Sequence, residues 1–532
     1  MTLPDRNNPY SFDDFLKWRN EFDYYADDEF LQKVVKHFAG DEWKSIDAEA
    51  RKVSLKVSFR WRDMAETIAQ PAKHPFMQHY DAHNHRIDRI VRPHEIEVME
   101  KEIFGEKLFS DQTPPWLRLL KMYLIYQNSD ACISCPITCT EGLVSLLETY
   151  ADTFETRQIL QHLRDGIDGE LAIGAQYLSE IQGGSDVPAN LLEAVQEGNQ
   201  WKLYGTKFFC SATHADYAVV TAKPAGSEKV AVFVVPSWLP GNKEKEIRNG
   251  VSIDRIKWKM GTSELTTAEL TYDGAIAYPL GPLDRGVAIV AGLVLTASRL
   301  TVGLSGAAGM TRAVREAKKY SELREAFGLN VSRFPMVEGQ IRRLEHAARR
   351  TTAASFKVYR EFAALEGGLQ KGLDTDEPVE IKKKRFMVRE LVMIQKMTTS
   401  WDATDVIRVS MSIFGGHGVM EDFSSLPRLY RDAAINELWE GPRNVLLSQV
   451  HRDLQRVASW FPPGEFVEHI LAGSDKSLVD GFATEMTDLV QNYNLFDMND
   501  ATIDACERWD NLCHRLFHTY QDLALQEVEA GE

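Results

Sequence analysis

A glutamate between a tryptophan and a glycine is the residue with the clearest potential for acid–base chemistry. Glu440 follows Trp439 and precedes Gly441. A carboxylate beside an aromatic ring becomes more basic, because burial disfavours its charged form. Such a group could remove a proton from a substrate carbon. The same three residues are also typical of a helix that ends in an acid before a glycine, and the motif alone favours this second interpretation.

A second motif combines adjacent glycines with hydroxyl groups. Gly183 and Gly184 stand between Ser179 and Ser185. Glycine has no Cβ, so the backbone here could approach a ligand closely. Taken alone, an ordinary Gly-Gly-Ser-Asp turn explains these residues better.

The elements that must position these residues follow one another in blocks of different character. The predicted blocks are a helical domain at 1–168, a β-domain at 169–285, a helical bundle at 286–461 and an acidic helical extension at 462–532. The predicted fold class is α+β, with an N-terminal helical domain, a central β-barrel-like domain, a C-terminal helical bundle and a short helical C-terminal extension. Strands and helices do not alternate, which disfavours a doubly wound sheet.

The central block carries the strand signals. Residues 201–209 predict a strand, a turn and a second strand, and residues 269–272 predict a strand that stops at the turn pair Asp273-Gly274. The β-branched runs 217–222 and 230–235 predict two more strands.

Composition excludes several classes of protein. The 532 residues suggest two to four domains, and six cysteines are too few for a disulfide scaffold. The net charge is −17, and residues 465–532 hold fifteen acidic but only three basic side chains. This acidic tail would repel a phosphate backbone, so no nucleic-acid partner is expected. No signal peptide and no membrane span are predicted, and we expect a cytoplasmic protein. No dinucleotide or P-loop glycine fingerprint is present.

Four stretches, in order, resemble the acyl-CoA dehydrogenase family over residues 60–460. They are residues 178–186, residues 207–211, residues 324–328, and residues 413–418 continued by 430–432 and 439–441. Each is weak alone, but their shared order and spacing around a β-domain is a specific signal. The resemblance implies FAD-dependent α,β-dehydrogenation of an acyl-CoA, within fatty-acid or aromatic-acid degradation.

The resemblance also implies roles for individual residues. Glu440 matches the base that removes the α-proton while a hydride leaves the β-carbon for flavin N5. The positions that match contacts to FAD are Leu178, Ser179, Gly184, Phe209, Ser211, Arg324, Phe327, Gly415, Gly416, His417, Gly418 and Arg443. The positions that match contacts to substrate are Ser185, Arg299, Trp439 and Gly441. Each has an ordinary structural alternative, such as core packing for Phe209 or a solvated surface for Arg324 and Arg443.

Partners follow from the same resemblance. Arg324 matches an arginine that reaches the FAD pyrophosphate of a neighbouring subunit, so a homodimer or homotetramer is expected. The expected electron acceptor is electron-transferring flavoprotein or a similar carrier, with an oxidase that uses O2 left open.

Local details are nearest to the alkylation-response (AidB-like) branch of the family. The resemblance to this branch leaves open a second function, that of a flavin-binding stress or regulatory protein of low turnover. Arg443 also leaves open a cyclic or carboxylated acyl-CoA as substrate, with ring desaturation or cleavage.

No metal site is predicted. Cys132, Cys135 and Cys139 lack the common zinc and iron–sulfur spacings, so buried thiols are expected. His79 and His83 would share a face if their segment were helical, but a packing or surface role is favoured.

Overall fold

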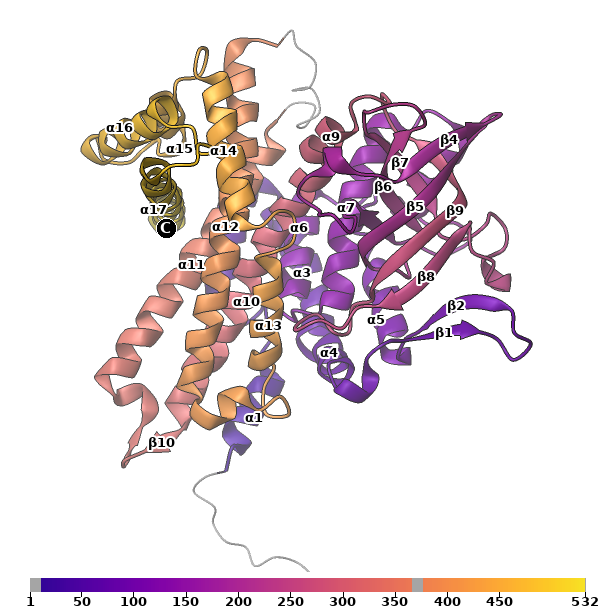
Figure 1. Cartoon of the computed structure of the whole chain (residues 1–532). Helices are drawn as coiled ribbons and strands as arrows, with labels where there is room; N and C mark the ends of the chain where they lie inside the picture. Colours follow the sequence, from indigo (N-terminus) through magenta and orange to yellow (C-terminus); the bar gives the residue numbers. More distant parts are fainter. Residues whose placement is uncertain (1–10, 366–376, 532) are drawn as a thin grey trace, which may run out of the picture.

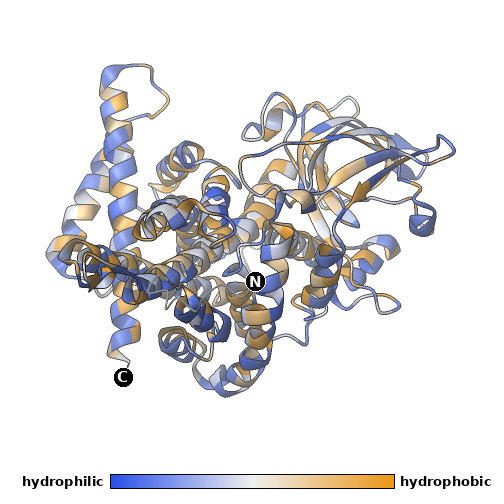
Figure 2. Cartoon of the chain, turned by 90° about the horizontal axis from the view of Figure 1, so that it is seen from below, coloured by the Kyte–Doolittle hydropathy of each residue, from blue (hydrophilic) through white to orange (hydrophobic). Residues whose placement is uncertain are grey.

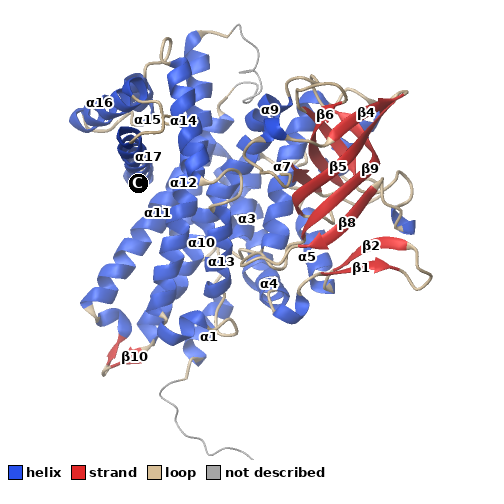
Figure 3. Ribbon diagram, viewed as in Figure 1, coloured by secondary structure: helices blue, strands red, loops and turns tan. Residues whose placement is uncertain are grey.

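The computed structural model describes residues 11–365 and 377–531 of the chain. A helical N-terminal part and a sheet lie side by side, and long helices pack along them (Figures 1 and 3). The N-terminal helices are α1 (Asp13–Glu21), α2 (Glu29–Ala39), α3 (Trp43–Leu55), α4 (Arg62–Ile68), α5 (His94–Phe104), α6 (Pro115–Tyr126), α7 (Ala131–Tyr150) and α8 (Phe154–Arg164). Within this part, strands β1 (Phe76–Tyr80) and β2 (Arg86–Val91) form an antiparallel hairpin that the sequence analysis did not predict.

Seven strands form the central sheet, which closes on itself. They are β3 (Gly174–Tyr177), β4 (Glu193–Glu197), β5 (Gln200–Ser211), β6 (Tyr217–Pro224), β7 (Ala231–Pro236), β8 (Val251–Ile256) and β9 (Thr267–Pro279). Hydrogen bonds run from β6 through β4, β5, β9 and β7 and back to β6, while β3 and β8 pair at the edges. The barrel-like domain expected from the sequence is therefore present.

Two turns predicted from the sequence are wrong, because both strands continue through their glycine, with Gly274 left as the extra residue of a bulge in β9. Gly205 adopts φ +127° inside β5, and Gly274 adopts φ +77° inside β9. The β5–β9 pairing shifts register between Leu203 and Tyr204 and then continues. A glycine lets a strand absorb an extra residue without ending, so both strands are longer than expected.

Long helices make up the C-terminal part. The bundle contains α9 (Gly286–Ile289), α10 (Leu295–Leu323), α11 (Pro335–Ala363), α12 (Val379–Ile413), α13 (Leu426–Asn436) and α14 (Arg443–Val457). A short hairpin of β10 (Glu325–Ala326) and β11 (Leu329–Asn330) follows α10. Helices α10 and α12 approach closely because glycines face α12: a Cβ on Gly303 would lie 2.2 Å from the Gln395 amide, and one on Gly306 would lie 2.8 Å from Thr399.

The C-terminal extension packs against the bundle. It contains α15 (Pro463–Ile470), α16 (Lys476–Asn492) and α17 (Asp500–Ala530), drawn in yellow beside α12 and α14 in Figure 1. Hydrophobic and hydrophilic residues are interspersed along the helices (Figure 2). Trp509 and Leu512 of α17 are buried in the same apolar core as the sheet and α6. The Trp509 indole donates a hydrogen bond to the Leu447 carbonyl at 3.0 Å, which ties α17 to α14.

Two helical segments in the described residues are long and apolar enough to cross a membrane. They are Ala131–Tyr150 and Gly286–Leu323, and 78% and 72% of their most apolar windows are buried inside the fold. This burial identifies both as core helices, whose apolar composition reflects contact with protein on all sides.

Candidate active site

Glu440 lies in a tight turn between α13 and α14. It adopts φ +57° and Gly441 adopts φ +98°. A side chain larger than glycine occupies this left-handed region only where its surroundings hold it there, at a cost of about 1–3 kcal/mol. Backbone strain of this kind is concentrated at functional sites.

Two buried cations hold this turn in place. Lys396 of α12 donates to the carbonyls of Glu437 at 3.0 Å and Gly441 at 2.7 Å. Arg299 of α10 donates through Nε to the Glu440 carbonyl at 2.9 Å. Burial lowers the pKa of Lys396 to about 7 and that of Arg299 to about 10, and the nearby Glu440 carboxylate opposes both shifts. The carbonyls of the turn thus point toward cations, which fixes the direction of the Glu440 side chain.

The Glu440 carboxyl group has one fixed oxygen and one free oxygen. Oε1 accepts a hydrogen bond from the Gln176 amide at 2.7 Å. Oε2 is buried and has no hydrogen-bond partner among the described residues. Burial raises the pKa of Glu440 to about 7, against the opposing effects of Arg299, Lys396 and the Gln176 hydrogen bond. A carboxylate with a pKa near neutrality and an unused oxygen is suited to accept a proton.

Gln176 connects this base to the glycine loop. It lies on β3, three residues before Ser179, so the two are at most about 10 Å apart along the chain. The Ser298 hydroxyl donates to Gln176 Oε1 at 3.4 Å and to the Val294 carbonyl at 2.9 Å. The strand that orients the base therefore leads directly into the loop that resembles a flavin-binding segment.

A buried ion pair anchors that loop to the sheet. Lys207 of β5 and Glu180 lie 2.8 Å apart, with side chains 0% and 3% exposed. Glu180 also accepts hydrogen bonds from the backbone of Leu191 and Leu192, at 2.6 and 3.1 Å. Burying two charges is favourable only with complete partners of this kind, so the pair fixes the position of the loop.

The loop and strand β5 meet at the residues predicted to contact a flavin. The Phe208 amide donates to the Ser179 carbonyl at 3.0 Å. Gly184 packs on Ser179, where an added Cβ would lie 2.3 Å from the hydroxyl oxygen. Leu178 lies partly buried in the core, whereas Ser185 is exposed. The structure therefore brings Ser179, Gly184 and β5 together.

An exposed aromatic ring lies next to these residues. Phe209 is 53% exposed, and the Lys257 ammonium group lies 4.6 Å from its ring centre. Two residues on, Ser211 is 3.0 Å from the Thr267 hydroxyl, to which the Lys259 ammonium donates at 3.1 Å. Burial lowers the pKa of Lys259 to about 8. An exposed aromatic platform with flanking donors can bind a planar ligand.

Apart from Arg443, the remaining predicted FAD contacts gather at the other end of the bundle, near α1 and β10 in Figure 1. The His417 ring is 3.2 Å from the Tyr320 hydroxyl, and the Arg324 guanidinium lies over Phe12 at 5.6 Å. Gly415 and Gly416 are exposed, and Gly418 is buried against Met411. Phe327 is 97% exposed at the tip of the β10–β11 hairpin. Within one chain, this group is separate from the one formed by Ser179 and Phe209.

Arg443 lies apart from both groups. It donates to Asp510 of α17 at 2.9 Å and to the Met397 carbonyl at 3.2 Å, and it stacks over Trp401 at 5.1 Å. Its guanidinium thus joins the extension to the bundle.

Trp439 is partly buried and packs on the core beside Glu440.

Sequence reasoning missed Gln176, Lys396 and the Lys207–Glu180 pair. Lys396 gave no signal, because a lysine in a long helix is usually solvated. Lys207 stands in a strand pattern, where its complete burial depends on Glu180 from a different segment. None of these roles is encoded by local spacing.

The suspected histidine pair is not helical. His79 lies in β1, where its ring is 2.7 Å from Asp88, and His83 lies beyond the end of that strand. The shared helix face considered for these residues is therefore wrong, because the segment forms a hairpin. Cys132, Cys135 and Cys139 are buried free thiols on α7, as expected.

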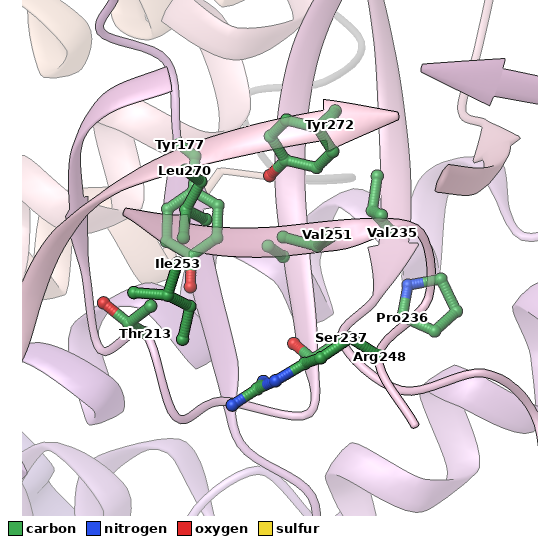
Figure 4. A pocket seen from close by; sticks show the side chains of 11 residues that line it. Tyr177, Thr213, Val235, Pro236, Ser237, Arg248, Val251, Ile253, Leu270 and Tyr272 are labelled. Carbon is green, nitrogen blue, oxygen red and sulfur yellow. The ribbon is translucent and has the colours of Figure 1, made fainter. Parts of the chain in front are cut away.

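The interior of the barrel offers only a small cavity. Its volume is about 20 Å³, and Tyr177, Arg248 and Tyr272 point into it (Figure 4). This space holds about one water molecule, which is far too small for a nucleotide. This cavity is therefore no candidate for a cofactor site.

Comparison with known proteins identifies the family of the chain. Residues 175–275 match the acyl-CoA dehydrogenase middle domain, and residues 284–455 match the acyl-CoA dehydrogenase C-terminal domain, so the two matches cover about half of the chain. The chain belongs to the acyl-CoA dehydrogenase family. It is an FAD-dependent oxidoreductase that acts on acyl-CoA, as its family is.

The relatives differ in how much of the chain they match. Acyl-CoA dehydrogenase family member 11 of Caenorhabditis elegans is 27% identical, over 80% of this chain and 70% of that protein. The putative acyl-CoA dehydrogenase AidB of Escherichia coli is 27% identical, over 63% of this chain and 60% of that protein. The crystal structure of C. elegans ACDH-11 in complex with C11-CoA superimposes with a TM-score of 0.78 at 22% identity, covering 94% of this chain and 90% of that one.

Proposed function

We propose that this flavoprotein introduces an α,β double bond into a CoA thioester, with Glu440 as the base. The observation that carries the proposal is the Gln176–Glu440 hydrogen bond of 2.7 Å. It joins a carboxyl group with a pKa of about 7 to the strand that leads into the glycine loop. Base and flavin-binding segment thereby belong to one site.

The proton is accepted by the free oxygen of Glu440. Oε1 is occupied by the Gln176 amide, while the buried Oε2 has no partner among the described residues. A substrate α-carbon placed at Oε2 transfers its proton to this oxygen as the β-carbon loses a hydride. The Glu440 backbone N–H supports the thioester oxygen, on which negative charge develops.

The chain fits FAD at the loop and at β5. Gly184 leaves room that a Cβ would fill beside Ser179, and Phe209 offers an exposed ring. Ser179 and Ser211 supply hydroxyl groups for the flavin edge, and Leu178 lines the loop. When bound there, FAD accepts the hydride from the β-carbon.

A second copy of the chain completes the cofactor site in this proposal. Arg324 and His417 lie at the far end of the bundle, so they serve the FAD of a partner subunit. Phe327 supports this arrangement, because a phenylalanine 97% exposed at a hairpin tip is typical of a contact surface. The proposed assembly is a homodimer or a pair of such dimers.

The substrate is a CoA thioester whose acyl group the site alone does not define. The C. elegans ACDH-11 structure contains C11-CoA, which supports an acyl group of similar size. Arg443 does not support a carboxylated acyl group, since Asp510 and the Met397 carbonyl engage its guanidinium. Electrons leave for electron-transferring flavoprotein or a similar acceptor.

Anaerobic titration of the holoprotein with acyl-CoAs of graded chain length tests the proposal. One of these thioesters should bleach the flavin absorption. Glu440→Gln should keep its FAD but reduce flavin about 10²–10⁴-fold more slowly, the usual contribution of a positioned general base.

Glu437→Gln is the matched control, because Glu437 lies in the same turn and the substitution keeps its carbonyl, which accepts from Lys396. It should bleach at close to the wild-type rate. Full activity in Glu440→Gln would refute the assignment of the base. A flavin that no thioester bleaches would favour a regulatory flavoprotein of low turnover.

A further inference from the structure

The extension meets the bundle at a cluster of three potential metal ligands. His514 and His518 lie one helical turn apart on α17, and Asp402 lies on α12. In the described residues, these three side chains form a cluster of potential ligands close enough to share an ion. Their ligand atoms all lie within 4.8 Å of one another. The cluster is separate from the Glu440 turn and is not used by the proposed reaction.

The spacing of the ligand atoms is close to that of a tetrahedral site. His518 Nε2 lies 2.7 Å from Asp402 Oδ2, and His514 Nε2 lies 3.7 Å from Asp402 Oδ1. Two ligands about 2.1 Å from one tetrahedral ion stand roughly 3.4 Å apart. Side-chain rotations would therefore be enough to place all three ligands around one ion. The imidazole rings, with centroids 4.0 Å apart, already face the same carboxylate.

His514 is the side chain that a simple ion pair does not explain. Its Nε2 points at Asp402 from beyond hydrogen-bond distance. Its Nδ1 is buried with no partner among the described residues. A half-buried imidazole without a hydrogen bond is unfavourable, and coordination through Nε2 would give the ring one strong interaction, with the proton on Nδ1.

The surroundings balance the charge of such a site. Arg443 pairs with Asp510, one turn before His514 on α17, and the two charges offset each other. The side chains of Asp402, His514 and His518 are 15%, 28% and 25% exposed, so an ion can enter from solvent and water can complete the coordination.

We propose that Asp402, His514 and His518 form a binding site for a divalent transition-metal ion such as Zn²⁺. Two imidazole nitrogens and one carboxylate oxygen suit borderline ions rather than Mg²⁺ or Ca²⁺. The bound ion links α17 to α12 and so fastens the acidic extension to the catalytic bundle. Paired histidines four residues apart on a helix provide two ligands at nearly fixed distance.

Zinc binding to the full-length holoprotein tests this site. The protein is dialysed against a chelator, equilibrated with Zn²⁺ and assayed for zinc by elemental analysis, with FAD content measured in parallel. The wild type should hold one more zinc ion per chain than the His514→Ala/His518→Ala double variant. Zn²⁺ should raise the melting temperature of the wild type and leave that of the double variant unchanged.

His346→Ala is the matched control. His346 of α11 also pairs with α17, through Asp522 at 3.1 Å, but belongs to no cluster of three potential metal ligands in the described part of the chain. This variant should bind zinc like the wild type. Asp402→Asn keeps the shape of the site and should weaken zinc binding even if the double variant folds poorly. Equal zinc content in the wild type, the double variant and Asp402→Asn would overturn the proposal.

Discussion

Removing the Gln176 amide should move the pH dependence of catalysis without removing the base. In Gln176→Leu, Glu440 Oε1 loses the hydrogen bond of 2.7 Å that favours its ionised form. The Ser298 hydroxyl keeps its bond to the Val294 carbonyl, so the substitution leaves no new unpaired hydroxyl group. The change therefore acts mainly on the carboxyl group.

The size of the effect follows from the charge on the acceptor. A hydrogen bond to a charged group contributes about 1.5–3 kcal/mol, and one pKa unit corresponds to about 1.4 kcal/mol. The pKa of Glu440, about 7 in the native protein, should rise by about 1–2 units. Because the base must be deprotonated, activity is lost as the pH falls through this pKa. The variant should be about 5–50-fold slower at neutral pH, yet close to the wild type well above its new pKa.

Stopped-flow flavin reduction across a pH series measures this shift as the midpoint of kcat/KM. Gln455→Leu is the control, because Gln455 bonds only the carbonyls of Val490 and Tyr493, far along α14. Its midpoint should equal that of the wild type. A Gln176→Leu midpoint that also stays at the wild-type value would refute the view that Gln176 tunes the base.

Two further substitutions test the flavin loop. Lys207→Met leaves the Glu180 carboxylate buried without its cation. We expect the free energy of unfolding in urea to fall by about 3–5 kcal/mol and FAD to be retained less well. The control is Lys202→Met, which removes an exposed ion pair and should lower the free energy of unfolding by less than about 1 kcal/mol. Equal stability of the two variants would contradict the anchoring role of the pair. Gly184→Ala places a Cβ 2.3 Å from the Ser179 hydroxyl oxygen. The affinity for FAD, measured by fluorescence titration, should therefore fall about tenfold or more. Unchanged affinity would mean that the loop does not approach the cofactor.

The order of elements could be read from the sequence because it depends on local patterns. Hydrophobic periodicity predicted the helices on either side of a β-domain, and the β-branched runs became β6 and β7. Local patterns failed at Gly205 and Gly274, since glycine occurs both in turns and inside strands, and only the pairing between β5 and β9 shows that both strands continue. The β1–β2 hairpin was missed because the histidine spacing suggested a helix face, although Asp81 and Asn84 are turn residues and Asn84 adopts φ +65°.

Motifs along the chain also marked Glu440 and the glycine loop as a candidate site, which stays a prediction, whereas the family that they indicated is confirmed. The partners of these residues come from distant segments. Gln176 meets Glu440 across 264 positions, and Lys396 and Arg299 reach the turn from two other helices. Arg443 shows the same limit: three residues from the base, it points to Asp510 of α17.

The sequence by itself determined the α+β order of elements, the family and the position of the carboxylate. Tertiary structure alone decided which charges lie beneath that carboxylate, which of its oxygens is free, and which histidines of the extension meet Asp402. The physical reason is that burial and electrostatic coupling depend on distance in space, so a pKa near 7 arises only when the fold removes Glu440 from water and surrounds it with Arg299, Lys396 and Gln176.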